Sequence, residues 1–407
     1  MSVIKPFRAL RPVPEKAEQV SCVPYDVISV GEAREIINNN SLSFLRVTRP
    51  EADEGGDQVS AEKVNAAARR YFDQLVSDGV FITEPEASLY IYRLDAGTHS
   101  QTGIVACCSL DEYEKGLIKK HEKTRPDKVE DRTNHMLAVG AQTGLIFLTH
   151  RGTEAVRSIV DAETGREPLY DFRCEKGVRQ TIWKVEKTDE LVSAFGEIPA
   201  IYVADGHHRI ESAFRAREVL KAKNPDHTGD EEYNFVIAGV FPSEDLKILP
   251  YNRVVRDLNG MADAEFLKRV GESFIVTESG QKEPQNHGDF SMYLGGKWYT
   301  LRFSVNYVQQ PDVIERLDVS ILQNFLLAPV LAVGDPRTDE RIGFIGGSRG
   351  TEELEALVDR GEARVAFSMF ATTMSDLLEV SDAGEIMPPK STWFEPKLKD
   401  GLLIHTI

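Results

Sequence analysis

The run Ala204-Asp205-Gly206-His207-His208-Arg209 gathers into one turn several residue types that handle phosphate. An apolar segment at 200–204 precedes it and a helical pattern follows, which predicts a strand, a turn and a helix start. Free N–H groups at a helix start bind anions, and the helix dipole strengthens their field. Gly206 allows close backbone approach, Arg209 can make a bidentate contact, and the histidines can donate hydrogen bonds.

Asp205 stands at the end of this strand, where a carboxylate can hold Mg²⁺ or orient a hydroxyl nucleophile. The alternative is an ordinary helix cap with solvent-facing histidines. A zinc site made by His207 and His208 is disfavoured, because adjacent residues rarely chelate one ion and no cysteine lies nearby in the sequence.

The charge-dense stretch 111–135 holds a second group of candidates. Phosphoryl transfer needs a carboxylate that takes the proton of the acceptor and cations that meet the phosphates. Glu122 can be this base, and Thr124 can hydrogen-bond a phosphate. The cations that can meet phosphates are Lys123, Arg125 and Lys128. The alternative is a solvated charged loop with i,i+4 pairs.

Two sites nearer the C-terminus offer further cations. Lys390 follows two prolines and can act as a point charge, with the hydroxyls of Ser391 and Thr392 beside it. The alternative is a segment that Trp393 and Phe394 pack back onto the protein. Arg253 follows Pro250 and can bind phosphate, although a lone arginine is more often a surface residue. The list of candidate phosphate ligands therefore includes Arg253 and Lys390.

Other catalytic motifs are absent from the sequence. There is no Gly-x-Ser-x-Gly, His-Glu-x-x-His or Gly-x-Gly-x-x-Gly pattern, which disfavours a lipase, a zinc protease and a dinucleotide dehydrogenase. The glycine-rich run 343–347 lacks the Lys-Ser/Thr of a Walker motif and predicts a strand and turn.

Composition bounds the class of protein. The 407 residues favour two domains, and the net charge of −17 disfavours nucleic acid as a partner. No apolar stretch reaches the roughly 18 residues of a membrane span, and the first residues lack a signal-peptide pattern, so we expect a cytoplasmic location and no membrane partner. The four cysteines show no CxxC spacing, which indicates buried reduced thiols.

The predicted elements alternate between strands and helices, which indicates an α/β or α+β fold with a mixed sheet. The clearest helices are 60–77, followed by Gly79, and 127–140. Strands at 88–93 and 103–110 form a predicted hairpin, and another hairpin spans 290–303 around Gly295-Gly296. We also expect a strand at 4–11, an apolar segment at 44–47 and a helix at 319–327. The pattern changes near 259, which divides the chain into 1–259 and 260–407.

Residues 204–209 resemble the signature of the ParB/sulfiredoxin superfamily, in the form seen in its free serine kinases. Nearly the full chain resembles a bacterial and archaeal family named DUF1015. The stretches that carry this resemblance are Ile4-Lys5-Pro6-Phe7-Arg8-Ala9, Val23-Pro24-Tyr25-Asp26-Val27, Ser43-Phe44-Leu45, His121-Glu122-Lys123-Thr124, Ile248-Leu249-Pro250-Tyr251-Asn252-Arg253 and the tail 387–396.

The resemblance implies a ParB/sulfiredoxin-like nucleotide-binding core in 1–259 and a smaller α+β region in 260–407. It also implies a Mg²⁺-dependent kinase that transfers a phosphoryl group from ATP or ADP to a small hydroxyl metabolite such as free serine. The expected catalytic residues are Asp205, which would also hold the metal, Glu122 and His208. The expected nucleotide and phosphate ligands are Gly206, His207, Arg209, Lys123, Thr124, Arg253 and Lys390.

Two other activities of the superfamily are disfavoured. Sulfiredoxins carry a cysteine in this turn, where this chain has His207, and DNA clamps need a basic helix-turn-helix region that this acidic chain lacks. A non-catalytic nucleotide-binding sensor or scaffold is the alternative function. The sequence leaves open whether the protein is a homo-oligomer.

Overall fold

The computed structural model describes residues 3–55, 59–174, 177–304 and 312–407. It contains two compact units, which we describe separately. The first comprises 1–120, 124–246 and 396–407, and the second comprises 121–123 and 247–395. This division differs from the predicted boundary at 259, because the chain passes into the second unit earlier and its last twelve residues return to the first.

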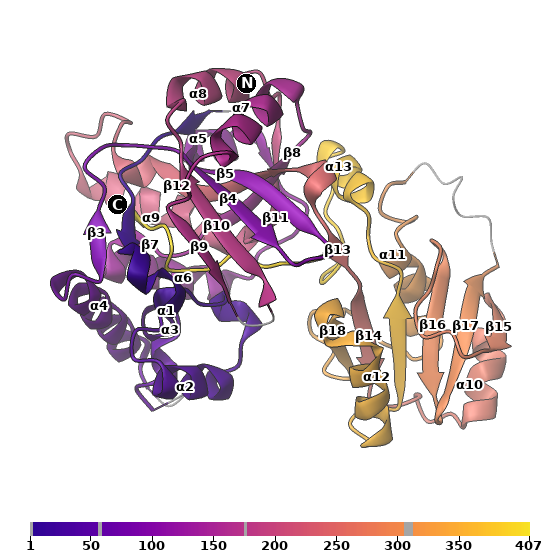
Figure 1. Cartoon of the computed structure of the whole chain (residues 1–407). Coiled ribbons are helices and arrows are strands. Elements are labelled where there is room, and N and C mark those ends of the chain that lie inside the picture. Colours follow the sequence, from indigo (N-terminus) through magenta and orange to yellow (C-terminus); the bar gives the residue numbers. More distant parts are fainter. Residues whose placement is uncertain (1–2, 56–58, 175–176, 305–311) are drawn as a thin grey trace. The chain divides into compact units, whose positions relative to one another are not determined.

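The first unit alternates strands with helices (Figure 1). Its helices are α1 (Ala17–Val20), α2 (Val30–Asn39), α3 (Leu45–Thr48), α4 (Ala61–Ser77), α5 (Leu110–Glu114), α6 (Pro126–Val139), α7 (Glu154–Thr164), α8 (Thr188–Gly196) and α9 (His207–Lys223). Its strands are β1 (Ile4–Lys5), β2 (Leu10–Pro12), β3 (Phe81–Thr83), β4 (Tyr90–Asp95), β5 (Ser100–Ser109), β6 (Ile118–Lys119), β7 (Ala141–Gln142), β8 (Ile146–His150), β9 (Tyr170–Arg173), β10 (Arg179–Lys184), β11 (Ile201–Asp205), β12 (Phe235–Pro242) and β21 (His405–Thr406).

A mixed sheet forms the centre of this unit, in the order β6-β11-β8-β12-β5-β4-β10-β9, with β1 beside β5. β11 is parallel to β6, and β8 is parallel to β12, but β11 and β8 run in opposite directions. The remaining neighbours, including the predicted β4–β5 hairpin, are antiparallel. The predicted mixed α/β class is therefore confirmed.

The two faces of the sheet are covered differently. On one face, alternate residues of β5 such as Ile104 and Ala106 belong to a buried apolar cluster with residues of α5, α7, α8 and α9. On the other face, the backbone of the C-terminal segment 396–407 lies against the strands. There the Lys399 N–H donates to Tyr92 Oη (3.4 Å), and Gln101 Nε2 donates to the Pro396 carbonyl (3.2 Å).

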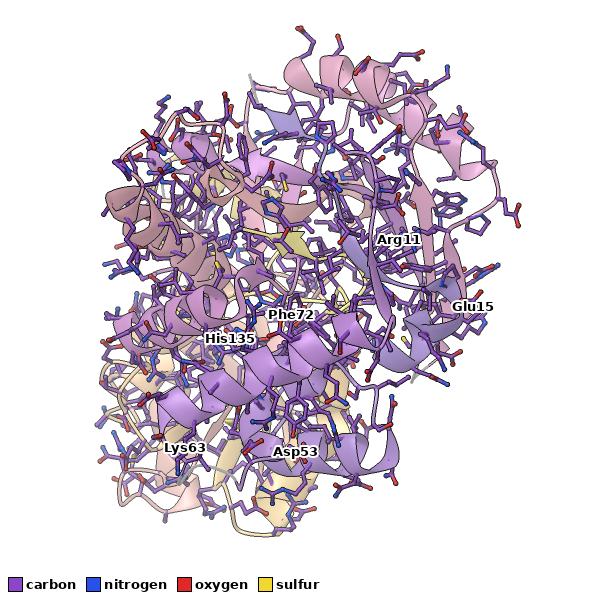
Figure 2. All side chains as sticks on the ribbon, turned by 90° about the vertical axis from the view of Figure 1, so that its left-hand side faces the viewer. Arg11, Glu15, Asp53, Lys63, Phe72 and His135 are labelled. Carbon is purple, nitrogen blue, oxygen red and sulfur yellow. The ribbon has the colours of Figure 1, made fainter. Side chains whose placement is uncertain are left out.

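Helix α4 follows from its amphipathic sequence, with Ala68, Phe72 and Leu75 buried on one face and charged residues on the other. Gly79 follows its end with a positive φ of 70°. Figure 2 shows the helix across the face turned to the viewer, with Lys63 and Phe72 along it. It packs on α6, which ends at the left-handed Gly140, a conformation that glycine adopts without strain. The predicted helices 60–77 and 127–140 are thus confirmed.

The second unit contains a six-stranded antiparallel sheet in the order β15-β17-β16-β19-β14-β18. Its helices are α10 (Asp263–Val270), α11 (Asp318–Leu322), α12 (Gly350–Asp359) and α13 (Met374–Asp382). Its strands are β13 (Ile248–Leu249), β14 (Tyr251–Val255), β15 (Phe274–Glu278), β16 (Asp289–Leu294), β17 (Lys297–Phe303), β18 (Ile342–Gly346), β19 (Val365–Met369) and β20 (Trp393–Phe394). Gly295 and Gly296 both have positive φ at the predicted turn of the β16–β17 hairpin.

Several local predictions need correction. The predicted strand 4–11 is two short strands, because β1 pairs with β5 whereas β2 pairs with β3. The apolar segment 44–47, for which no secondary structure is predicted, is the N-cap and most of helix α3. The predicted helix 319–327 is α11 followed by a π-helical turn, Gln323–Leu327. The four cysteines are free, as expected, but Cys174 is only partly buried.

The sheet tolerates little added volume where β5 meets β12. A Cβ at Gly103 would lie 2.6 Å from the Phe241 ring and 2.7 Å from the Val240 carbonyl oxygen. We predict that Gly103→Ala lowers the free energy of unfolding by about 1–3 kcal/mol, measured by urea denaturation. Gly31→Ala in α2 is the control, since its Cβ would meet nothing within 4 Å. Equal stabilities of the two variants would contradict the close packing of these strands.

Candidate functional site

The turn between β11 and α9 begins the site. Asp205 is the last residue of β11, and Gly206 caps the 17-residue helix α9 with φ 92° and ψ 28°. This left-handed conformation favours glycine over residues with a Cβ. The Gly206 carbonyl accepts from the N–H groups of Arg209 (2.9 Å) and Ile210 (3.1 Å), which closes the first helical turn. The predicted strand, turn and helix start are confirmed.

Asp205 is held in its ionised form by two donors. Its Oδ2 accepts from Lys397 Nζ at 2.5 Å, and its Oδ1 accepts from the Gly206 N–H at 2.8 Å. Burial opposes ionisation, but the Lys397 ammonium outweighs it and holds the pKa of Asp205 well below its usual range. Although the carboxyl group is surrounded by protein atoms, 39% of the side-chain surface stays exposed, so a ligand can reach it.

Arg209 faces a carboxylate of the protein itself. Its Nη1 lies 2.9 Å from Asp400 Oδ1 and its Nη2 lies 3.3 Å from Asp400 Oδ2, a two-point contact. Burial alone would lower the pKa of Arg209, but Asp400 and Asp26 raise it above its usual value. The predicted contact of Arg209 with phosphate stays a prediction, and a ligand would share the guanidinium with Asp400.

Lys397 and Asp400 were not predicted from the sequence. They lie 192 and 191 residues from their partners in the turn, in a C-terminal segment without a recognisable motif. The backbone of Asp400 exchanges hydrogen bonds with that of Cys22 at 3.2 and 2.9 Å, which fixes the segment. Their place in the site follows from the backbone pairing of Cys22 with Asp400, which becomes known only with the fold.

The two histidines have different surroundings. His207 is buried, with 4% of its surface exposed, so the alternative of a solvent-facing histidine is wrong for this residue. His208 Nε2 accepts from the Arg125 N–H at 3.0 Å, which places the proton of a neutral ring on Nδ1. The start of α6, just after the predicted ligand Thr124, therefore lies beside the turn.

A hollow of about 350 Å³ opens at this turn. Its polar lining comes from Asp26, Asp205, Gly206, Arg209 and Lys397, and its apolar lining includes Leu145 and Phe147. A second hollow shares Arg209 and is lined also by Tyr25, Arg132 and His135. Arg132 and Arg209 both stack on the Tyr25 ring, at 4.4 and 5.3 Å from its centre. A helix start with nearby cations suits a small anionic ligand.

Among the other predicted site residues, Thr124, Arg125 and Lys128 belong to the first unit and the rest to the second. Glu122 and Lys123 lie in its short segment 121–123, and Arg253 and Lys390 are neighbours within it. Arg253 Nη2 donates to the Lys390 carbonyl at 3.0 Å, and Nη1 donates to the Tyr251 carbonyl. Lys390 has a positive φ of 57°, which is uncommon for a residue other than glycine.

Arg253 is buried, with 4% exposure, so the alternative of a surface arginine is wrong. Burial lowers its pKa to about 10, and within the described residues no carboxylate forms an ion pair with it. Buried charges are normally neutralised, so this guanidinium is suited to an anion. The alternative for 389–394, a segment packed back onto the protein, also holds in part, because Trp393 and Phe394 form β20, which pairs with β13.

The donor set is poor for a metal held by protein alone. Among the described residues, no group of three or more histidine, cysteine, aspartate or glutamate side chains is arranged to hold an ion.

Within the same ranges, every helix is too short or too polar to cross a membrane.

Comparison with known proteins matches residues 4–320 to a family described as "protein of unknown function (DUF1015)". No curated protein matches the chain. Among solved structures, free serine kinase in complex with AMP is 16% identical, with a TM-score of 0.38 and with 74% of this chain and 91% of that chain covered. A conserved hypothetical protein from Pyrococcus furiosus is 14% identical, with a TM-score of 0.36 and coverages of 74% and 94%. C-terminally truncated SbnI from Staphylococcus aureus is 12% identical, with a TM-score of 0.39 and coverages of 74% and 86%.

The Arg209–Asp400 pair should contribute strongly to stability. We predict that Asp400→Asn lowers the free energy of unfolding by about 3–5 kcal/mol, because it leaves a buried guanidinium without its carboxylate. Asp26→Asn is the matched control, since Asp26 lies 3.9 Å from Arg209 and its side chain is 53% exposed. Denaturant titration measures both. A change below about 1 kcal/mol in Asp400→Asn would contradict the importance of this pair.

His135 should make stability depend on pH. Its Nε2 donates to the Val47 carbonyl at 2.7 Å, and burial lowers its pKa to about 4 from the ordinary 6.5. Between these two pH values, His135 is protonated in the unfolded chain but not in the folded protein. The free energy of unfolding therefore falls as the pH drops from 6.5 toward 4. We predict that His135→Gln reduces this slope. Subtracting the variant's free energy of unfolding from that of the unchanged protein at each pH removes the contributions of the other titrating groups. Parallel curves would contradict the prediction.

Proposed function

The chain belongs to the DUF1015 family, and from the chemistry of its β11–α9 turn we propose that it is a nucleotide-dependent phosphotransferase acting on a small hydroxyl compound. The observation that carries the proposal is an accessible, ionised Asp205 beside a lysine at the start of a long helix. A carboxylate that stays charged at neutral pH can orient a hydroxyl group, and the helix start can receive a phosphate.

In this proposal the donor phosphates lie at the start of α9, near Gly206 and His207, with Lys397 as an added cation. The terminal phosphoryl group leaves the bridging oxygen of the nucleotide and joins the hydroxyl oxygen of the acceptor. The acceptor's proton passes to a carboxylate, for which Asp205 and Glu122 are the candidates. Catalysis of this kind depends on positioning and on neutralising charge, which rigid ion pairs favour.

The turn can hold Mg²⁺ only together with a bound nucleotide. Mg²⁺ sites commonly use one or two carboxylates together with phosphate oxygens and water, so Asp205 can hold it once a nucleotide supplies the remaining oxygens. The ion would then neutralise charge on the phosphates, and Lys397 would have to release one oxygen of Asp205.

The finer assignments depend on the resemblance. The run 204–209 supports a ParB/sulfiredoxin-like core, and free serine is the acceptor that the same run suggests. His208, Lys123, Thr124, Arg253 and Lys390 stay predicted ligands or catalytic groups. ATP and ADP are both compatible with the turn, and a cytoplasmic location stays a prediction.

A non-catalytic nucleotide sensor is the second candidate. One observation favours it: Asp205 and Arg209, the two strongest charges of the turn, already have partners inside the protein. A site that is neutralised before the ligand arrives can bind without reacting.

We predict that the purified protein, supplied with ATP or ADP, Mg²⁺ and a panel of hydroxyl metabolites including serine, forms a phosphorylated product detectable by ³¹P NMR. Asp205→Asn should lower the rate at least about 100-fold, because positioned acid–base groups contribute this much. Lys397→Gln should weaken nucleotide binding more than it lowers the maximal rate. Glu122→Gln tests the predicted base.

Glu218→Gln is the matched control, since Glu218 is an exposed carboxylate on α9 paired only with Arg217 among the described residues. Circular dichroism confirms that each variant is folded. Nucleotide binding without product from any acceptor would favour the sensor. Full activity in Asp205→Asn would refute the assignment of this residue.

A further inference from the structure

The central sheet contains two parallel strand pairs that point in opposite directions. β11 and β6 form one pair, and their carboxyl ends lie at the edge that carries the turn described above. β8 and β12 form the other, and their carboxyl ends lie at the opposite edge of the sheet. Ligands of α/β proteins bind where parallel strands end, so the second edge is a natural place for a separate site.

A hollow of about 500 Å³ opens at this second edge. It lies where β8 and β12 end at His150 and Pro242, under helix α7, and all its lining residues belong to the first unit. It shares no residue with the hollows around Asp205 and Tyr25.

The inner wall of this hollow is apolar. Ile104, Val156, Val160 and Val240 line it, and each has at most 8% of its surface exposed. A hydrocarbon group of a few carbons placed here would leave water, at a gain of about 25 cal/mol per Å² of apolar surface buried. The wall therefore selects a ligand with a small aliphatic part.

One buried polar group also lines the hollow. His150 is 1% exposed, and its Nδ1 lies 2.9 Å from the Arg151 carbonyl oxygen, which can only accept, so Nδ1 carries the proton. Burial lowers the pKa of His150, so the ring is neutral and its Nε2 is an acceptor.

The rim of the hollow carries both signs of charge. Arg157 and Asp161 come from α7, and Asp245 follows β12. Arg157 Nη2 and Asp245 Oδ1 are 3.8 Å apart, and the side chains are 49% and 28% exposed, so this loose pair can open at little cost. Burial raises the pKa of Asp245, Arg157 and His99 lower it, and Glu244 and Asp161 raise it, so charges of both signs act on this carboxyl group.

The loop just before α7 carries a protein carboxylate. The Gly152 N–H lies 3.3 and 3.2 Å from the two carboxylate oxygens of Glu244. A second anion such as phosphate would meet Glu244, Asp161 and Asp245 together. This edge of the sheet therefore disfavours a purely anionic ligand and favours one that carries an ammonium group.

We propose that this hollow binds a small aliphatic amino acid as a zwitterion. Asp161 and Asp245 receive the ammonium group, Arg157 receives the carboxylate, and the side chain lies on the wall of Ile104, Val156, Val160 and Val240. The proposal is independent of the phosphoryl chemistry proposed for the β11–α9 turn, because no residue is shared between the two hollows.

Isothermal titration calorimetry of the full chain tests the ligand class with three probes of similar shape. L-Leucine carries both charges, 3-methylbutylamine lacks the carboxylate and 4-methylpentanoate lacks the ammonium group. We expect leucine to bind and each analogue to bind at least about tenfold more weakly, because each analogue loses the hydrogen bonds of one charged group. No leucine binding at millimolar concentration, or equal binding of the amine and leucine, would overturn the proposal.

Variants test the location. Asp245→Asn and Arg157→Gln should each weaken leucine binding at least about tenfold, and Val160→Phe should abolish it by filling the hollow. Glu154→Gln on the same helix, outside the lining, and Asp205→Asn at the other edge should leave it unchanged. If Asp245→Asn fails to fold, the surface-exposed Arg157→Gln decides. Unchanged leucine binding in Arg157→Gln and Val160→Phe would place the ligand elsewhere and refute the site.

Discussion

The buried ion pair between Arg209 and Asp400 joins helix α9 to the C-terminal segment 396–407 within the first unit. Two charges taken out of water lose hydration energy that only close and well-directed contacts can offset. The bidentate geometry meets this requirement, and Gly144 leaves room for it, since a Cβ there would overlap both the guanidinium and the carboxylate. Because Asp400 also pairs through its backbone with Cys22, the C-terminal segment can take only one register. This register brings Lys397, three residues earlier, to Asp205.

The charges of the candidate site therefore depend on the end of the chain. Asp205 would be costly to bury alone at the end of β11, and Lys397 makes its ionised form stable. The turn is thus rigid before any ligand binds, which reduces the entropy lost on binding. The same pairing sets a condition on chemistry, because a phosphate or Mg²⁺ at the turn has to share Lys397 or Asp205 with its present partner.

Local features of the fold were predictable because their causes are local. The strand, glycine turn and helix at 201–223, the amphipathic α4 and the β16–β17 hairpin follow from periodicity and from glycines with positive φ. Lys397 and Asp400 were not predictable, since their roles arise from strand pairing across about 190 residues. The return of 396–407 to the first unit has the same cause, and so has the difference from the predicted boundary at 259.

The burial of Arg253 was also beyond the sequence, because a single arginine after a proline carries no periodic signal of a core position. In the structure, two backbone carbonyls and the ring of Phe344, 5.3 Å away, surround its guanidinium. The environment of Arg253 therefore becomes known only with the tertiary fold. The positive φ of Gly206, in contrast, could be expected from the residue type alone.

The reversal of strand direction between β11 and β8 explains how one sheet can carry two unlike hollows. β11 leads through the left-handed N-cap Gly206 directly into α9, and β8 leads through Gly152 and the N-cap Thr153 into α7. At Gly206 the N–H is bound by Asp205, whose charge Lys397 balances, so the helix start keeps a cationic neighbour. At Gly152 the N–H is bound by Glu244, and the remaining carboxylates outnumber the single Arg157. The turn at one edge therefore favours an anion and the loop at the other favours an ammonium group, because different charged side chains surround them.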